Sequence, residues 1–128
     1  LACAGLERLG GQSGALPQEI HPLRPDQCVP SPCQGILGLE FARPEVAECL
    51  SILADPDTHW MMRAERAYLA ALGGDCNLPA GGFGVIQGQQ MVFDAVLWRD
   101  GALRRSRLEG DVDEAEELGR RAASQLLG

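Results

Sequence analysis

Apolar residues recur at intervals of three and four positions in several segments, which is the period of a helix. The clearest stripe is formed by four residues: Met61, Ala64, Tyr68 and Leu72. Similar stripes, together with prolines at helix starts and glycines at helix ends, predict four helices. They are expected at residues 1–9, 44–54, 57–72 and 113–127. Asp57 or Thr58 is expected to cap the third.

Other segments alternate between apolar and polar or small residues, which is typical of strands. Three such segments follow one another at residues 80–86, 91–98 and 103–108. The last two are joined by Asp100 and Gly101, a pair that favours a tight hairpin turn, so these strands are expected to be antiparallel. A further strand is expected over residues 36–41.

We therefore expect an α+β fold, in which a small three-stranded antiparallel sheet carries helices on one face and follows a fragment of an α/β domain. Residues 1–42 are expected to be that fragment, with a helix end, a proline-rich connector over residues 12–32 and one strand. Residues 43–128 are expected to form the C-terminal α+β domain.

Charge and hydropathy narrow the classes of protein to consider. The 128 residues include 18 acidic and 11 basic side chains, and the net charge of −7 argues against a surface that binds nucleic acid. The chain contains no apolar run near the roughly 20 residues that a membrane span needs, and no signal peptide is recognised. We therefore expect a cytoplasmic protein without nucleic-acid or membrane partners.

The five cysteines are odd in number and widely spaced, which fits a reducing compartment better than a disulfide scaffold. His21, Cys28 and Cys33 could belong to a zinc site, and Cys28 and Cys33 could form a reversible disulfide. The Cys-x4-Cys spacing has no second pair, so incidental cysteines are the favoured interpretation and no metal is expected.

Cys76 has a distinctive setting. Gly73 and Gly74 are expected to end the preceding helix, and Pro79 cannot extend one, so Cys76 is expected in an exposed turn that reagents can reach. The alternative is that Cys76 is a buried small apolar residue, as free cysteines often are.

Three segments in the same order resemble one known family. Residues 64–84, AERAYLAALGGDCNLPAGGFG, resemble the cofactor-attachment segment AERAxLxxLGGxCxxPxGGFG of the porphobilinogen deaminases, also called hydroxymethylbilane synthases. Residues 1–10, LACAGLERLG, resemble the family's LAxAGLxRLG helix, and residues 29–40, VPSPCQGILGLE, resemble its LPAxGQGALGIE segment. The resemblance covers nearly the whole chain and begins inside the second of the family's three domains.

The resemblance implies a transferase of tetrapyrrole and heme biosynthesis that polymerises four porphobilinogen molecules into hydroxymethylbilane and releases ammonia. It implies a dipyrromethane cofactor attached to Cys76 through a thioether, with Arg66, Gln34 and Gly35 as further cofactor-binding residues. Arg8 is implied to bind substrate. The family's catalytic aspartate lies in the first domain, so this chain is expected to hold no catalytic residue and to be inactive alone. The implied partners are porphobilinogen and the missing N-terminal domains, and the complete enzyme is expected to be a monomer.

The residue types suit that chemistry. A thiolate is a strong nucleophile, and a thioether resists hydrolysis while a product chain is built and released. Arginine binds the acetate and propionate groups of pyrroles through paired hydrogen bonds and stays charged. From spacing alone, Arg66 could equally be an ion-pair partner on a solvated helix face.

Three positions depart from the family pattern. Cys33 replaces a glycine and Ile36 an alanine beside Gln34 and Gly35, which makes this segment bulkier. Asp75 precedes Cys76, and a neighbouring carboxylate raises the pKa of a thiol. An alternative function is therefore a non-catalytic, stand-alone binding or scaffold domain of the same fold.

Overall fold

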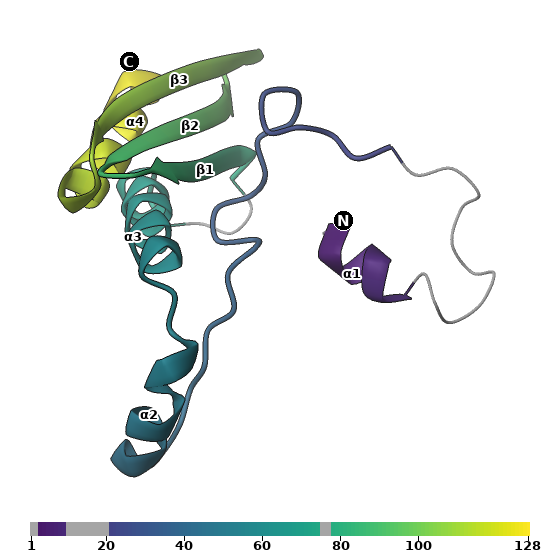
Figure 1. Cartoon of the computed structure of the whole chain (residues 1–128). Helices are drawn as coiled ribbons and strands as arrows, with labels where there is room; N and C mark the ends of the chain where they lie inside the picture. Colours follow the sequence, from purple (N-terminus) through teal and green to yellow (C-terminus); the bar gives the residue numbers. More distant parts are fainter. Residues whose placement is uncertain (1–2, 10–20, 75–77) are drawn as a thin grey trace.

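A three-stranded sheet with two helices on one face forms the C-terminal part of the chain in the computed structural model (Figure 1). The structure describes residues 3–9, 21–74 and 78–128. The sheet consists of β1 (Ala80–Gln87), β2 (Gln90–Arg99) and β3 (Ala102–Asp111). The helices that cover it are α3 (Pro56–Ala71) and α4 (Ala115–Leu127), and the short 3₁₀ helix η2 (Val112–Glu114) leads into α4. The predicted α+β fold with helices on one face is confirmed.

The strands lie in the order β1-β2-β3, and both neighbouring pairs are antiparallel. In the turn between β2 and β3, Asp100 and Gly101 have φ angles of 53° and 77°. Positive φ at both central residues matches the right-handed twist of the flanking strands, which is why an Asp-Gly pair predicts this hairpin. The two strand pairings set Asp94 of β2 between Phe83 of β1 and Arg107 of β3.

The core lies between the sheet and the two helices. Eleven apolar residues there are buried, and they come from α3, β2 and α4: Ala64, Tyr68, Met91, Phe93, Ala95, Leu97, Ala115, Leu118, Ala122, Ala123 and Leu126. The rings of Tyr68 and Phe93 meet edge to face with centroids 5.8 Å apart. The Tyr68 hydroxyl donates a 2.8 Å hydrogen bond to the carbonyl of Val96, so its polar end is satisfied inside the core.

Helix α3 begins one residue earlier than expected. Pro56 occupies the first turn, and the Asp55 carboxylate accepts a 3.2 Å hydrogen bond from the Thr58 backbone N–H. Because proline fixes a helical φ and needs no hydrogen-bond acceptor, it suits the first helical position. The cap is therefore Asp55, and the expectation that Asp57 or Thr58 caps this helix was wrong.

The elements before α3 add little to the core. They are α1 (Cys3–Leu9), α2 (Pro44–Leu50) and the 3₁₀ helix η1 (Ser51–Leu53), and neither α2 nor η1 buries a residue. Figure 1 shows α2 extending away from the sheet beyond the start of α3, with α1 apart from both. None of the helices in the described part of the chain has the length and apolar character that crossing a membrane requires.

The strand expected over residues 36–41 is not formed. In the described part of the chain, β1, β2 and β3 pair only with one another, so this segment has no neighbouring strand to complete its hydrogen bonds. Ile36 is half-buried, but the other apolar side chains of the segment are exposed, with Leu37 89% and Leu39 60% exposed. The alternating pattern is present, but a strand also needs a partner.

Candidate functional site

Cys76 and the neighbouring Asp75 lie outside the described residues, so the structure describes only the two ends of their loop. At the first end, Gly73 and Gly74 have φ angles of 106° and 68°. The Gly74 N–H donates to the carbonyl of Leu69 and the Gly73 N–H to that of Ala70, at 2.9 and 3.1 Å. This pair of bonds satisfies the last carbonyls of α3 and ends the helix where the sequence predicted.

At the second end of the loop, the chain enters β1 through Leu78 and Pro79. The carbonyl of Pro79 accepts a 2.9 Å hydrogen bond from the Trp98 N–H, which ties this end to β2. The loop therefore joins the C-terminal end of α3 to the edge strand of the sheet (Figure 1).

Arg66 lies on α3, less than two turns before the helix ends, and its side chain is exposed. Arg66 forms no ion pair with another described residue. The interpretation of Arg66 as an intrahelical ion-pair partner therefore has no support from the described residues.

Gln34 and Gly35 lie in a turn that packs beside α3. The Gln34 N–H donates to the carbonyl of Ser31, and the Ile36 N–H donates to that of Cys33, each at 3.1 Å. We call residues 31–36 the connector turn. Cys33 adopts a φ of 63°, in the left-handed region that favours the glycine of the family pattern, so the cysteine keeps a glycine-like backbone at some strain.

The connector turn is attached to the sheet domain by Glu65, a residue that the sequence analysis did not single out. The Glu65 carboxylate is 5% exposed and accepts backbone hydrogen bonds from Cys33 at 2.5 Å and from Gly84 at 3.2 Å. Burial raises the pKa of Glu65, and the two hydrogen bonds oppose that rise. The available signal was its position between Met61 and Tyr68 on the apolar face of α3, where a carboxylate needs a buried partner.

Two charged side chains of α3 affect the pKa of the thiol in the connector turn. Burial and the nearby Glu65 carboxylate raise the pKa of the Cys33 thiol, while the Arg66 guanidinium acts in the opposite direction. Because Glu65 holds the backbone of Cys33 and Arg66 follows Glu65 in α3, three predicted site residues, Gln34, Gly35 and Arg66, lie in one region. It does not bring Arg8 there, because Arg8 is an exposed residue of the separate helix α1 (Figure 1).

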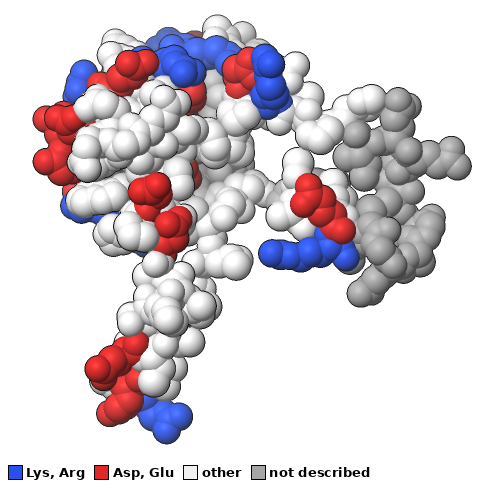
Figure 2. Space-filling model, in the orientation of Figure 1, with Lys and Arg blue, Asp and Glu red and all other residues white. Residues whose placement is uncertain are grey.

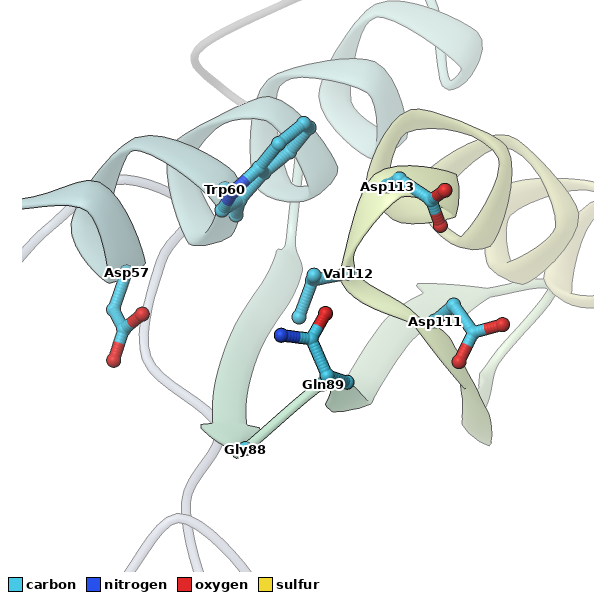
Figure 3. A pocket seen from close by; sticks show the side chains of 7 residues that line it. All are labelled: Asp57, Trp60, Gly88, Gln89, Asp111, Val112 and Asp113. Carbon is cyan, nitrogen blue, oxygen red and sulfur yellow. The ribbon is translucent and has the colours of Figure 1, made fainter.

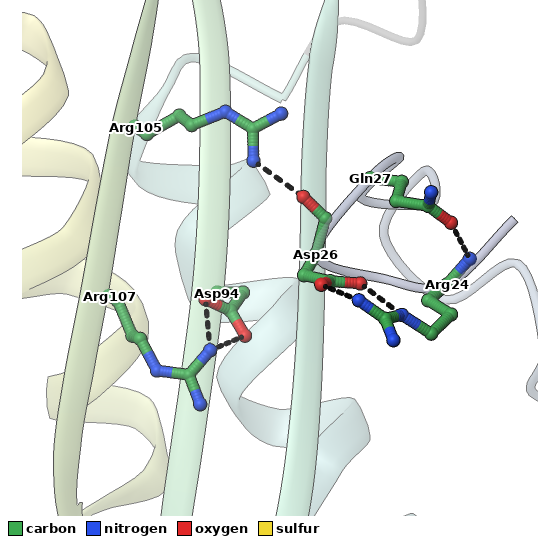
Figure 4. A network of polar contacts seen from close by, with 6 residues as sticks. All are labelled: Arg24, Asp26, Gln27, Asp94, Arg105 and Arg107. Atoms are coloured by element: carbon green, nitrogen blue, oxygen red, sulfur yellow. Dashed lines mark hydrogen bonds and ion pairs between the residues drawn. The ribbon is translucent and has the colours of Figure 1, made fainter.

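The residues before the connector turn lie against the sheet. An Arg105 N–H donates a 3.2 Å hydrogen bond to the Asp26 carbonyl, and the Gly82 N–H donates a 2.9 Å bond to the Pro30 carbonyl. Figure 4 shows Arg24 paired with the Asp26 carboxylate and Arg107 paired with Asp94 in the same region. These contacts fix the path of the chain into the connector turn.

We consider two hollows in the surface of the described residues as possible binding sites. The first lies where β1 and β2 meet beside the starts of α3 and α4, and it is lined by Asp57, Trp60, Gly88, Gln89, Asp111, Val112 and Asp113 (Figure 3). Figure 3 shows the carboxylate of Asp57 on the opposite side of the hollow from those of Asp111 and Asp113. In the described part of the chain, no group of histidine, cysteine or acidic residues could hold a metal ion, and Cys28 and Cys33 are free thiols.

The second hollow is a mostly apolar groove that runs from Gly35 along residues 36–41 to α2, η1 and the start of α3. Figure 2 shows an uncharged surface between the rounded C-terminal part and the charged tip of α2. Gly35 is the one predicted site residue in the lining of either described hollow.

A family model and several curated relatives indicate which family this chain belongs to. The family model for "Porphobilinogen deaminase, C-terminal domain" matches residues 60–128. The chain is 38% identical to the porphobilinogen deaminase of Acidothermus cellulolyticus, over 99% of the chain and 40% of that relative. It is 34% identical to the porphobilinogen deaminase of Ruthia magnifica and 36% identical to that of a Roseiflexus species, in each case over 99% of the chain and 42% of the relative. The chain thus spans about two fifths of the length of the curated relatives it matches.

Proposed function

Because the chain belongs to the porphobilinogen deaminase family and corresponds to its C-terminal portion, we propose that it is the cofactor-carrying part of a hydroxymethylbilane synthase. The complete enzyme would polymerise four porphobilinogen molecules with release of ammonia, in the cytoplasm and as a monomer. In this proposal, residues 43–128 form the cofactor-carrying domain and residues 1–42 belong to the preceding domains. The catalytic aspartate belongs to the N-terminal domains, so the chain alone is inactive.

The observation that most supports this proposal is the way α3 ends. Gly73 and Gly74 stop the helix with left-handed backbone, and β1 begins at Ala80. A cysteine between two such fixed ends suits a tether, because both ends of the segment are anchored to the domain. Cys76 would hold the dipyrromethane through a thioether, and the bound dipyrromethane would supply the terminal pyrrole to which substrate units are joined.

The residues near this loop fit a group that carries several carboxylates. Arg66 offers an exposed guanidinium without an ion-pair partner among the described residues, and guanidinium binds carboxylate through two parallel hydrogen bonds. The connector turn presents the exposed Gln34 and Gly35 to the same region. Arg8 would bind substrate carboxylates once the N-terminal domains position α1.

The test is to co-express the chain with the missing N-terminal part of the enzyme and to measure the intact mass of the purified protein. We expect the mass of two linked pyrroles on the chain, a pink colour with an aldehyde reagent, and release of ammonia from porphobilinogen. Cys76→Ser should abolish the adduct and the colour. Cys49→Ser removes an exposed thiol of α2 and serves as the matched control, which should keep both.

Two outcomes would contradict the proposal. The first is normal turnover or an unchanged adduct in Cys76→Ser, which would remove the cysteine from its role as tether. The second is an unmodified mass of the wild-type chain in the presence of the N-terminal part, which would favour a non-catalytic binding or scaffold domain.

A further inference from the structure

Glu65 joins two segments that are distant in sequence. One carboxylate oxygen accepts from the backbone N–H of Cys33, 32 residues away, and the other accepts from that of Gly84, 19 residues away. Through this one side chain, α3 holds both the connector turn and the edge strand β1. No other described residue accepts hydrogen bonds from both of these segments through its side chain.

The geometry needs a carboxylate in particular. Both partners are donors, and an ionised carboxylate presents an acceptor at each oxygen. A glutamine of the same size would present one acceptor and one NH₂ group, so one backbone N–H would face another donor. An aspartate is one methylene shorter and cannot reach both partners without a shift of the backbone. The cost of burying a charge is therefore offset here by two hydrogen bonds that a neutral isostere cannot make.

The connector turn depends on this attachment for its position relative to Arg66. Its internal hydrogen bonds shape the turn but do not connect it to α3. Arg66 follows Glu65 in the helix, and both of their charges act on the Cys33 thiol, so the turn lies beside this pair of residues. A turn released from Glu65 would still follow the segment that the Pro30–Gly82 hydrogen bond ties to β1, but Gln34 and Gly35 would no longer be held against α3 beside the guanidinium.

We propose that Glu65 is a positioning residue, which holds Gln34 and Gly35 in fixed register with Arg66 so that the three can bind one group together. This inference rests on the proposed function, because it assigns Glu65 to the assembly of the cofactor-binding residues. Glu65 itself does not touch the bound group in this assignment. It acts through the backbone of Cys33.

The attachment can be measured on the 128-residue chain alone by NMR. In an isotope-labelled sample followed against pH, the amide resonances of Cys33 and Gly84 should shift together with one common midpoint, because both amides donate to the same titrating group. In Glu65→Gln both shifts should stop, and in Glu65→Asp at least one should be lost. Glu117→Gln removes an exposed carboxylate of α4 as the matched control and should leave both shifts unchanged. Independent midpoints in the wild type would overturn the proposal, even if a Glu65 variant failed to fold.

The consequence for cofactor binding is measured in the protein co-expressed with its N-terminal part. We expect Glu65→Gln to lower the rate of adduct formation on Cys76 roughly tenfold, since small misplacements of binding groups cost large factors in rate. Glu117→Gln should load at the wild-type rate. Coupled amide shifts with unchanged loading in Glu65→Gln would overturn the positioning role. A wild-type chain that never carries the adduct would instead contradict the proposed function, and the NMR result would then stand by itself.

Discussion

The close approach of α4 to α3 at Gly119 depends on the absence of a side chain there. A Cβ atom at this position would lie 2.9 Å from the Tyr68 nitrogen and 3.1 Å from the Ala64 carbonyl carbon, and closer still to the Ala64 carbonyl oxygen. These are backbone atoms of the neighbouring helix and cannot rotate away. Because the two helices form one side of the core, separating them also loosens the packing around Tyr68.

Gly119→Ala should therefore destabilise the chain by about 1–3 kcal/mol, the usual cost of overpacking. This exceeds the gain of about 1 kcal/mol that alanine brings to a helix interior. Urea unfolding followed by circular dichroism measures the difference. Gly5→Ala is the control, because a Cβ at Gly5 of α1 meets nothing within 4 Å, and its stability should be equal or higher. Equal stability of Gly119→Ala and the parent chain would contradict the close packing of the helices.

Single residues also show which features can be predicted from the sequence and which cannot. The apolar stripe of α3 correctly predicted that Ala64 and Tyr68 are buried, because a helical period links residues that are near in sequence. The role of Glu65 could not be predicted in the same way. Its partner at Cys33 is 32 residues away, and no local pattern indicates which backbone N–H will meet a buried carboxylate.

At the scale of elements, the start of α3 depends on the charge of Asp55. The Asp55 carboxylate accepts hydrogen bonds from the Thr58 hydroxyl and backbone N–H, and these bonds hold the pKa of Asp55 below its ordinary value. A carboxyl whose pKa is lowered by folding adds stability above its unfolded pKa of about 3.9, and that stability is lost as the pH falls through the folded pKa.

Two substitutions at Asp55 distinguish the contribution of its hydrogen-bond acceptor to stability from the contribution of its negative charge. Asp55→Asn keeps an acceptor for Thr58 but has no charge, so its melting temperature should be below that of the parent near pH 7 and approach it near pH 3. Asp55→Ala removes the acceptor as well and should melt lower than Asp55→Asn at pH 7. Thermal melts across this range measure both. A constant difference between the parent and Asp55→Asn at every pH would contradict the role of the charge.

The elements that sequence predicts well are those whose signals are local. The hairpin between β2 and β3 follows from two adjacent residues, Asp100 and Gly101, and the end of α3 follows from Gly73 and Gly74. The strand expected over residues 36–41 was wrong for a different reason. An alternating pattern marks a segment that can be one strand of a hydrogen-bonded pair. No strand of the described sheet pairs with this segment.

The candidate site was predicted from family motifs, and the roles of its residues stay predictions. Family motifs indicated Gln34, Gly35 and Arg66, and the structure brings these three into one region. Their common attachment through Glu65 arises only when the connector turn meets α3, which is a tertiary contact. Cys76 stays a prediction, since it lies outside the described residues.

For the whole molecule, the most exposed of the large apolar side chains that the structure describes lie outside the sheet and the two helices that cover it. Leu37 and Ile52 are 89% and 87% exposed, and Leu39 and Leu53 are also mostly in solvent. Leu37, Leu39 and Leu53 line the apolar groove beside α2, and Ile52 precedes Leu53 in η1 at its edge. The protein spans about two fifths of its relatives' length. We expect this surface to pack against the N-terminal part, because burial of such side chains contributes about 25 cal/mol per Å².

Leu37→Glu and Ile52→Glu test this expectation, because an exposed side chain matters for association and not for the fold of the chain alone. Each variant should unfold within about 0.5 kcal/mol of the parent, as surface substitutions do. Each should lose co-purification with a tagged N-terminal part, because a glutamate would have to be buried without a partner. Leu103→Glu changes a half-exposed leucine of β3 and should still co-purify. If Leu37→Glu and Ile52→Glu co-purify as well as Leu103→Glu does, the groove does not face the N-terminal part.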